Sequence, residues 1–167
     1  MSKLLATLAL FFIFLSCGFK PIYKIAIDDT GIAGYSMVVT NQVAREVIEE
    51  VNNTVVQGEN PKYKARLSIY EDLTPLIVNT NGTVAKYRIE IEIKYELLKL
   101  DNDEVISKGT TRGFAQYDVT GSEIVNEDTR KSMTKIATKN AIQLMTSRIQ
   151  SSICLLYTSP SPRDWLQ

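Results

Sequence analysis

Apolar and polar residues alternate through the middle of the chain, as they do in β-strands with one buried and one solvated face. The alternation covers residues 63–70 and, after the turn residues Asn79 to Gly82, returns more strongly over residues 85–97. Successive side chains of a strand point to opposite faces of the sheet, so residues of one parity should form the buried face. A last strand is expected over residues 105–117. One solvated face is typical of an antiparallel sheet.

Two other segments show the period of an amphipathic helix. In the first, valines recur at every fourth position from Val39 to Val55, with charged residues on the opposite side. This spacing predicts a helix that starts between Ser36 and Thr40 and ends before Gly58. The second helix is predicted over residues 123–153. The apolar seam that should face the sheet consists of Met133, Ile136, Ala137, Ala141, Leu144, Met145 and Ile149.

The order of these elements predicts the fold class. With a short first strand at residues 24–27, the chain reads β-α-β-β-β-α. Both helices need to cover the same apolar face of one sheet. The expected fold is therefore α+β: a two-layer sandwich in which two helices pack on one face of a mostly antiparallel four-stranded sheet.

The N-terminus has the pattern of a bacterial lipoprotein signal. One positive residue, Lys3, precedes an almost continuous apolar run over residues 4–15, which is shorter than the roughly 20 residues of a spanning helix. Ser16 and then Cys17 follow, and a cysteine after a small residue is the position that receives a lipid. Phe14 stands where this motif usually has leucine. We predict a signal peptide at residues 1–16 and lipidation of Cys17. For the apolar run the alternatives are a buried helix or a short membrane anchor, and for Cys17 a free or disulfide-bonded thiol.

The C-terminal segment differs in character from the rest. Residues 154–164 read CLLYTSPSPRD, which resembles a translated adapter of a transposase sequencing library. The alternative is a genuine Pro- and Ser-rich tail. We expect residues 154–167 to be non-native and residues 17–153 to form the periplasmic domain. Cys154 is then not native, and Cys17 is the remaining cysteine.

Composition narrows the chemistry that this domain can carry. The chain has no histidine, and a lipidated Cys17 leaves no thiol for catalysis or zinc. Without Lys3, Arg163 and Asp164, its 19 basic and 19 acidic residues fall to 17 and 18, which gives no basic footprint for nucleic acid. No Gly-rich phosphate loop occurs, and the acidic clusters sit in turns. We expect no enzyme activity, no metal and no cofactor.

The solvated face of the strands is the candidate contact surface. Alternation places Lys64, Arg66, Lys86 and Arg88 on it, together with Lys94. Glutamates lie between these cations, so a solvated face with mixed charges is one interpretation. The other is contact with an anionic partner such as lipid phosphates.

Residues 17–23, CGFKPIY, resemble the start of the mature LPS-assembly lipoprotein LptE in its alphaproteobacterial form. The resemblance continues, with less specific motifs, through residue 153. It implies a Gram-negative outer-membrane lipoprotein that faces the periplasm, plugs an LptD-like β-barrel translocon, helps to assemble it and aids lipopolysaccharide transport. Cys17 is the one functional position that the resemblance carries over; as lipopolysaccharide contacts we predict the cations that alternation places on the solvated face, Lys64, Arg66, Lys86 and Arg88. Gly18 after the lipid-bearing cysteine is compatible with the outer membrane.

Two other functions stay open at this point. An auxiliary lipoprotein of an ABC-type lipid-transport system would also place a small α+β domain after a lipid anchor. A lipid-tethered periplasmic hydrolase is the third possibility, although the catalytic side chains that it would need are scarce here.

Overall fold

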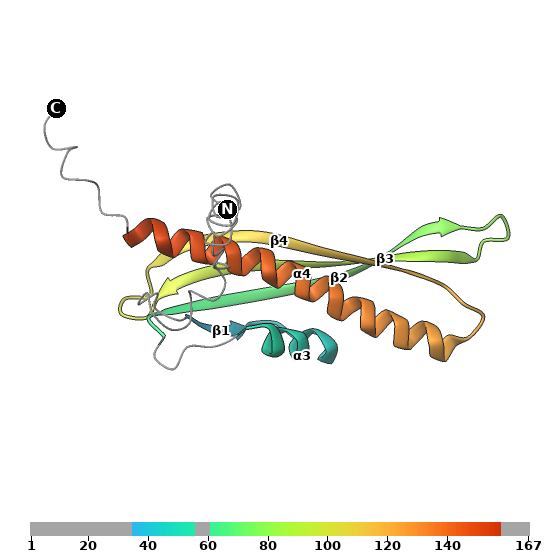
Figure 1. Cartoon of the computed structure of the whole chain (residues 1–167), viewed down its shortest axis with the longest axis horizontal. Helices are drawn as coiled ribbons and strands as arrows, with labels where there is room; N and C mark the ends of the chain where they lie inside the picture. Colours follow the sequence, from blue (N-terminus) through green and yellow to red (C-terminus); the bar gives the residue numbers. More distant parts are fainter. Residues whose placement is uncertain (1–34, 56–60, 158–167) are drawn as a thin grey trace, which may run out of the picture. The chain divides into compact units, whose positions relative to one another are not determined.

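Six helices and strands make up the part of the chain that the computed structural model describes, residues 35–55 and 61–157. In chain order they are β1 (Tyr35–Val39), α3 (Arg45–Thr54), β2 (Tyr63–Val78), β3 (Val84–Lys99), β4 (Val105–Asp118) and α4 (Glu123–Tyr157). The strands form one sheet in the order β1-β2-β3-β4, with β1 parallel to β2 and the other neighbours antiparallel (Figure 1). The predicted α+β class and element order are confirmed.

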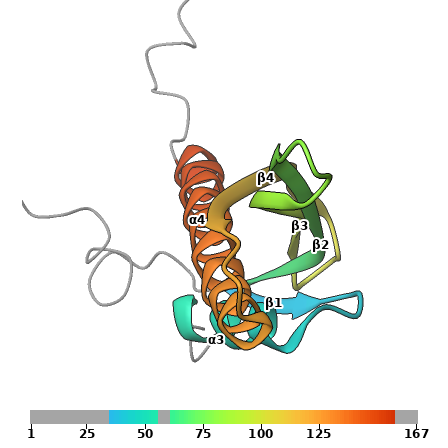
Figure 2. The same cartoon turned by 90° about the vertical axis from the view of Figure 1, so that its right-hand side faces the viewer.

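The two helices lie on one side of this sheet (Figure 2). α4 packs along β3 and β4, and α3 packs against α4. We call the sheet face toward the helices the inner face and the opposite one the outer face. Large side chains that are almost fully buried come from both layers: Val47, Leu67, Ile69, Ile89, Ile91, Ile93, Leu97, Ile142, Met145, Ile149 and Ile153.

The register of β3 follows the predicted alternation. Ile89, Ile91 and Ile93 have no exposed surface, whereas the neighbouring Glu90 and Glu92 lie on the outer face and are partly exposed. β2 is longer than its own alternation suggests. It continues past residue 70 as far as Val78, because it stays paired with β3 through the last position before the turn. Backbone pairing thus extends the strand beyond its buried apolar positions.

The predicted start of the first helix is wrong. Residues 35–39 form strand β1, and α3 begins only at Arg45. Val39 lies opposite Leu67 in the parallel pair, where a β-branched side chain fits well. Of the valine series, Val47 and Val51 are the buried helical members. The predicted strand at residues 24–27 lies outside the described residues.

Asn41 marks the point where the chain leaves the sheet. Its side-chain Nδ2 donates to the carbonyl of Ile69 at 2.6 Å, and its Oδ1 accepts from the Ile69 N–H at 3.0 Å. The amide therefore occupies the place of one more peptide group in the β1–β2 ladder. The N-cap position of α3, Ala44, has no side-chain cap. The Asn41 side chain, three residues before this N-cap position, pairs with the sheet instead of capping the helix.

The buried seam of α4 differs in part from the predicted one. Ile136 and Leu144 are 43% and 50% exposed, while Ile142 is fully buried. The helix approaches β4 so closely that a β-carbon on Gly113 would overlap the carbonyl oxygen of Ala137. Small residues on both elements permit this close approach. Two threonines, Thr134 and Thr138, are buried in this helix, whereas the sequence pattern had placed Ile136 and Leu144 in the seam.

Side chains of α4 also cover the outer edge of β4. Arg148 Nη1 donates to the carbonyl of Thr110 at 2.7 Å, and Asn140 Nδ2 donates to the carbonyl of Phe114 at 3.5 Å. β4 is the last strand of the sheet, so these carbonyls face away from β3. The contacts satisfy backbone groups that an edge strand leaves unpaired.

Candidate functional site

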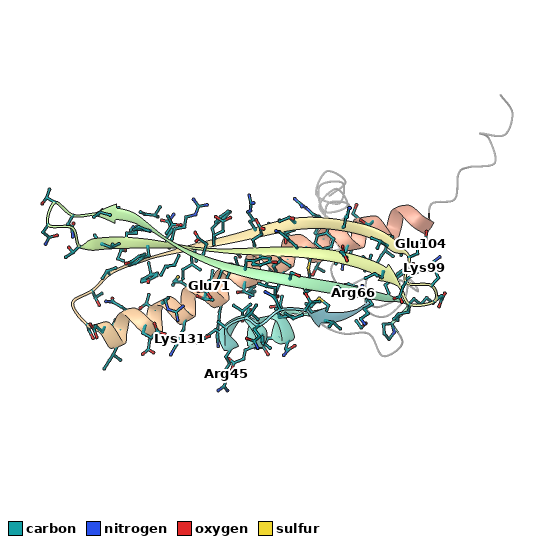
Figure 3. The ribbon with its side chains drawn as sticks, turned by 180° about the vertical axis from the view of Figure 1, so that it is seen from behind. Arg45, Arg66, Glu71, Lys99, Glu104 and Lys131 are labelled. Carbon is teal, nitrogen blue, oxygen red and sulfur yellow. The ribbon has the colours of Figure 1, made fainter. Side chains whose placement is uncertain are left out.

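All four predicted contact residues lie on the outer face, but the structure does not bring them together. Arg66 of β2 lies opposite Glu96, toward the end of the sheet away from the β2–β3 turn (Figure 3). Lys64 precedes it on the same face. Arg88 lies opposite Thr74 and Gln116, toward that turn, with Lys86 beyond it. The set is therefore two separate pairs of cations.

The pair nearer the turn is already engaged. Lys86 Nζ lies 3.1 Å from a carboxylate oxygen of Asp118, its cross-strand neighbour. The Arg88 guanidinium carbon lies 4.0 Å from the centroid of the Phe114 ring, a cation–π contact. Its Nε is buried and has no hydrogen-bond partner among the described residues. These contacts hold the two cations close to the sheet.

The centre of the outer face is an ion-pair network. Arg112 contacts Glu90 at 3.2 Å and Glu92 at 2.6 Å, and Lys94 reaches Glu92 at 3.5 Å. The hydrogen bond from Arg112 holds the pKa of Glu92 below its usual value, and the same bond raises the pKa of Arg112. Charges of opposite sign balance here. The centre therefore offers less attraction to an anion than a count of its cations suggests.

Beside this network, toward β1, the outer face is hollowed. The hollow has a volume of about 450 Å³ and combines three cations with three serine or threonine hydroxyl groups and one carboxylate. The side chains that supply these groups are Arg66, Lys94, Lys108, Thr40, Ser68, Thr110 and Glu96. We call this the basic hollow.

A second hollow, of about 600 Å³, adjoins the first and shares Lys94 and Thr110 with it. Arg148 and Leu144 of α4 line its far side. Of the cations around the two hollows, Arg66 and Lys94 were predicted on the outer face, whereas Lys108 and Arg148 were not predicted there. Alternation along β4 could have revealed Lys108, whereas the place of Arg148 depends on how α4 packs.

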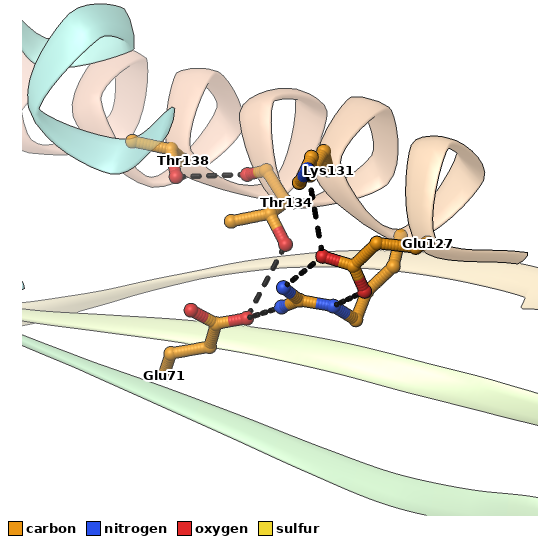
Figure 4. Close-up of polar contacts among 6 residues, drawn as sticks. Glu71, Glu127, Lys131, Thr134 and Thr138 are labelled. Atoms are coloured by element: carbon orange, nitrogen blue, oxygen red, sulfur yellow. Dashed lines mark hydrogen bonds and ion pairs between the residues drawn. The ribbon is translucent and has the colours of Figure 1, made fainter. Parts of the chain in front are cut away.

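The inner face carries a polar network that the sequence pattern did not predict. Glu71 of β2 lies opposite Ile91 and so points toward α4. Its carboxylate accepts hydrogen bonds from Arg130 at 3.2 Å and Thr134 at 3.3 Å (Figure 4). Arg130 also binds Glu127 through Nε and Nη2, both at 2.9 Å. Lys131 lies 3.7 Å from Glu127.

The charges of this network stabilise one another. The hydrogen bond from Arg130 lowers the pKa of Glu127, and the reciprocal bond raises the pKa of Arg130 far above its usual range. Arg130 and Glu71 are about three-quarters shielded from solvent, with side chains 30% and 25% exposed. The network fixes the distal half of β2 to α4, which is a structural role.

Several predicted features lie where the structure gives no description. The signal peptide at residues 1–16, the lipid-bearing Cys17 and residues 158–167 are outside the described ranges. Among residues 35–55 and 61–157, no group of three or more His, Cys, Asp or Glu side chains is placed to hold a metal ion. Within the same ranges, no helix has the length and apolar character needed to cross a membrane.

Comparisons with known proteins place the fold. No protein-family model matches the sequence, and no curated protein matches it either. The crystal structure of a predicted lipoprotein from Caulobacter crescentus CB15 aligns with a TM-score of 0.58 and 18% identity, covering 78% of this chain and 96% of that one. The solution structure of an uncharacterized lipoprotein B from Nitrosomonas europaea gives 0.53 and 13%, covering 75% and 88%. The chain thus shares the fold of these bacterial lipoproteins.

Proposed function

We propose that this chain is a lipid-anchored outer-membrane lipoprotein of the LptE type, which sits within an LptD-like β-barrel and assists lipopolysaccharide delivery to the outer leaflet. The observation that carries the proposal is the shared fold with two lipoproteins, together with the predicted lipid position at Cys17 and the CGFKPIY motif. The proposed role is binding and assembly, without catalysis.

The outer face suits a polar enclosure. Along β3 it presents Glu90, Glu92, Lys94 and Glu96, and β4 adds Lys108 and Arg112. The interior of a large outer-membrane barrel is polar, whereas its lipid-facing surface is apolar. A domain with this charged face is matched to the inside of a barrel. The predicted lipopolysaccharide contacts, Lys64, Arg66, Lys86 and Arg88, lie on the same face.

The outer edge of β4 is compatible with enclosure of this domain in a β-barrel. Its carbonyls at Thr110 and Phe114 accept hydrogen bonds from Arg148 and Asn140, so these two groups are not free to pair with a foreign strand. Contact with a barrel would then use side chains on the outer face, and charge complementarity would set the orientation.

Affinity purification of the tagged full chain from solubilised envelopes tests the proposal. We expect a large outer-membrane barrel to co-purify, and Arg112→Glu to reduce its recovery because the substitution reverses a charge at the centre of the outer face. Lys139→Glu is the matched control, since Lys139 is exposed on α4 and forms no ion pair within the described ranges. Recovery of an inner-membrane transporter instead would favour the auxiliary lipoprotein of an ABC-type system.

A further inference from the structure

We propose that the edge of strand β2 from Glu71 to Pro75 is a docking site for an extended segment of another protein, in which apolar and basic residues alternate. The segment adds to the sheet as a further strand beside β2. We call residues 71–75 the open edge. The inference goes beyond the proposed function and is independent of it, because it rests on the backbone of β2 and not on the outer-face cations.

The open edge exists because β1 is much shorter than β2. β1 ends at Val39, opposite Leu67, and the Asn41 side chain fills one more place beside Ile69. β2 continues as far as Val78 and stays paired with β3 on its other side (Figure 1). Among the described residues, no strand pairs with this continuation on the β1 side.

The alternation of the strand determines which backbone groups face the open edge. Ile69 directs its N–H and C=O away from β3, since both pair with Asn41. Every second residue of a strand directs these groups to the same edge. Glu71, Leu73 and Pro75 continue this series, and no described residue pairs with their backbone groups on that side. Pro75 fits its place because its missing N–H would point away from β3.

The backbone of the open edge is accessible to a partner. Glu71 is exposed as a residue, although its side chain is only 25% exposed and binds Arg130. Much of its accessible surface therefore belongs to the main chain. The helix that follows β1, α3, packs on α4 and not on β2. Unpaired backbone groups at an accessible sheet edge favour the addition of another strand.

A small hollow at one end of the open edge can accept a side chain of the added strand. It has a volume of about 280 Å³ and lies between β2 and the start of α3. Its lining consists of Asn41, Gln42, Val43, Ala44, Val47, Ile69, Tyr70 and Glu71. The wall that α3 and its approach provide is largely apolar. Side chains on the helix-facing side of the added strand should therefore be apolar.

Charge on the outer face determines the alternate positions of the segment. Asp72 lies directly opposite Glu90 of β3, and like charges in this arrangement are destabilising. Arg112 contacts Glu90, whereas Asp72 forms no ion pair within the described ranges and accepts a hydrogen bond from Thr74. A basic side chain on the added strand would lie beside Asp72, on the side away from Glu90. It would offset the repulsion between the two carboxylates.

A second copy of this chain fits the open edge poorly. Two copies paired antiparallel about Leu73 would bring the Asp72 carboxylates of both copies onto the same face, close to each other. The symmetry would also use Pro75 twice, and each proline would leave the carbonyl of the facing Glu71 without a donor. A basic segment of a different protein meets no such repulsion.

Binding of synthetic peptides to the full chain, purified in detergent, tests the site. The first probe is an end-capped peptide of about seven residues that alternates valine and lysine, and fluorescence anisotropy measures its affinity. Two further probes carry N-methyl groups, one on every valine and the other on every lysine. Each of these lacks the N–H donors of one peptide edge only, because donors alternate along a strand.

We expect one N-methylated probe to bind the wild type at least about tenfold more weakly than the unmodified probe, because it loses several hydrogen bonds to β2. The other should stay within about threefold. Loss with N-methylated valines would indicate antiparallel addition, and loss with N-methylated lysines would indicate parallel addition.

Variants of the open edge supply the matching change on the protein. Leu73→Pro removes an N–H that faces away from β3, and it should weaken binding of the unmodified probe at least about fivefold. Leu73→Ala is the matched control, since it truncates the same side chain and keeps the N–H, and it should stay within about twofold. Pro75→Ala adds a donor and should tighten binding about threefold. Circular dichroism verifies that each variant is folded.

The charge argument has its own variant. Asp72→Asn should weaken binding of the unmodified probe about threefold and reduce the dependence of its affinity on salt. Equal affinities of Asp72→Asn and the wild type would show that charge does not select the segment.

Equal losses with both N-methylated probes would overturn the inference, as would equal affinities of Leu73→Pro and Leu73→Ala or no binding of the unmodified probe. Sedimentation of the chain without peptide should find a monomer. A dimer that Leu73→Pro abolishes would assign the open edge to a second copy and would also overturn the inference. Recovery of a barrel in the envelope experiment is a separate result, because it does not depend on these residues.

Discussion

Gly113 of β4 lies against the backbone of α4 at Ala137, where a β-carbon at residue 113 would overlap the Ala137 carbonyl oxygen and approach the Ala141 nitrogen within 2.6 Å. The neighbouring Thr111 donates to the Ala141 carbonyl at 3.0 Å. The two elements therefore meet backbone to backbone. This contact sets how closely the helix layer lies over the last strand.

The first prediction follows from that contact. Gly113→Ala should destabilise the domain by about 2–3 kcal/mol, because neither backbone can move without disturbing the strand or the helix. Gly121→Ala is the control, since a β-carbon there meets nothing within 4 Å, and it should change stability by less than about 0.5 kcal/mol. Urea denaturation followed by circular dichroism measures both. Equal midpoints would show that the helix can shift away from β4 at little cost.

A second prediction concerns the alternation of β3. Ile91 has no exposed surface, whereas its neighbour Glu90 lies on the outer face. Ile91→Ala should cost about 3 kcal/mol through loss of buried apolar contact and the cavity left behind. Glu90→Ala should cost less than about 1 kcal/mol, because its contact with Arg112 is a surface ion pair. Thermal melts that shift both variants equally would contradict the assignment of the two faces.

The third prediction addresses the network around Arg130. Arg130→Met should destabilise the folded domain by about 1–2 kcal/mol, because it leaves the shielded carboxylate of Glu71 without its positively charged partner. Arg45→Met provides the comparison. Arg45 pairs with Glu49, but the Arg45 side chain is 89% exposed, so this substitution should have almost no effect on stability. In a double-mutant cycle, Glu71→Gln with Arg130→Met should reveal coupling of about 1 kcal/mol. Strict additivity would exclude a link between β2 and α4 through this pair.

A fourth prediction is the dependence of stability on pH. The pKa values of Glu49, Glu92 and Glu127 are lowered, chiefly by hydrogen bonds from Lys135, Arg112 and Arg130 respectively. A carboxylate with a lowered pKa in the folded state stabilises the fold above its ordinary value of 4.5, and this contribution is lost as the pH falls through the lower, folded-state value. The urea midpoint should therefore fall below about pH 4.5.

The dependence of the urea midpoint on pH should also contain a range in which the midpoint is constant, and a variant provides a control. The chain contains no histidine, so the midpoint should be nearly constant between about pH 5.5 and 7. Arg112→Gln removes the main cause of the lowered pKa of Glu92 and should make the acid limb shallower. A midpoint that changes most between pH 6 and 7 would point to a different titrating group.

The fifth prediction concerns the anchor. Cys17 follows a short apolar run that ends at Ser16. Metabolic labelling with a radioactive fatty acid should mark the wild type, and Cys17→Ala should lose both the label and the membrane fraction. Cys154→Ala is a matched control that should keep both. Equal labelling of the Cys17 variant would rule out this lipidation site.

Much of the fold could be predicted because its signals are local. The alternation in β3 and the long helical segment define their elements without reference to the rest of the chain. β1 could not be recognised in this way, because a five-residue edge strand is held by its parallel partner and its valines also fit a helical period. Glu71 was missed for a related reason. It interrupts the apolar pattern of β2 but still occupies an inner position, where α4 supplies the partner.

The candidate site was harder to predict than the fold. Parity along a strand correctly places Arg66 and Arg88 on the same face, but it contains no information about which cations already have partners. Asp118 neutralises Lys86 from the next strand, and Lys108 joins Arg66 only through Glu96 between them. Such relationships depend on the register of three strands, which one strand's sequence does not reveal.

The side chain of Asn41 ends the pairing between β1 and β2. Its side-chain amide donates a hydrogen bond to the Ile69 carbonyl and accepts one from the Ile69 N–H. If β1 continued, a backbone peptide group would make these two hydrogen bonds. Replacing that nitrogen by oxygen, as deamidation to aspartate does, would turn the donor into an acceptor facing the Ile69 carbonyl. Deamidation of Asn41 would therefore weaken the junction between the sheet and α3 while leaving the hydrophobic core unchanged.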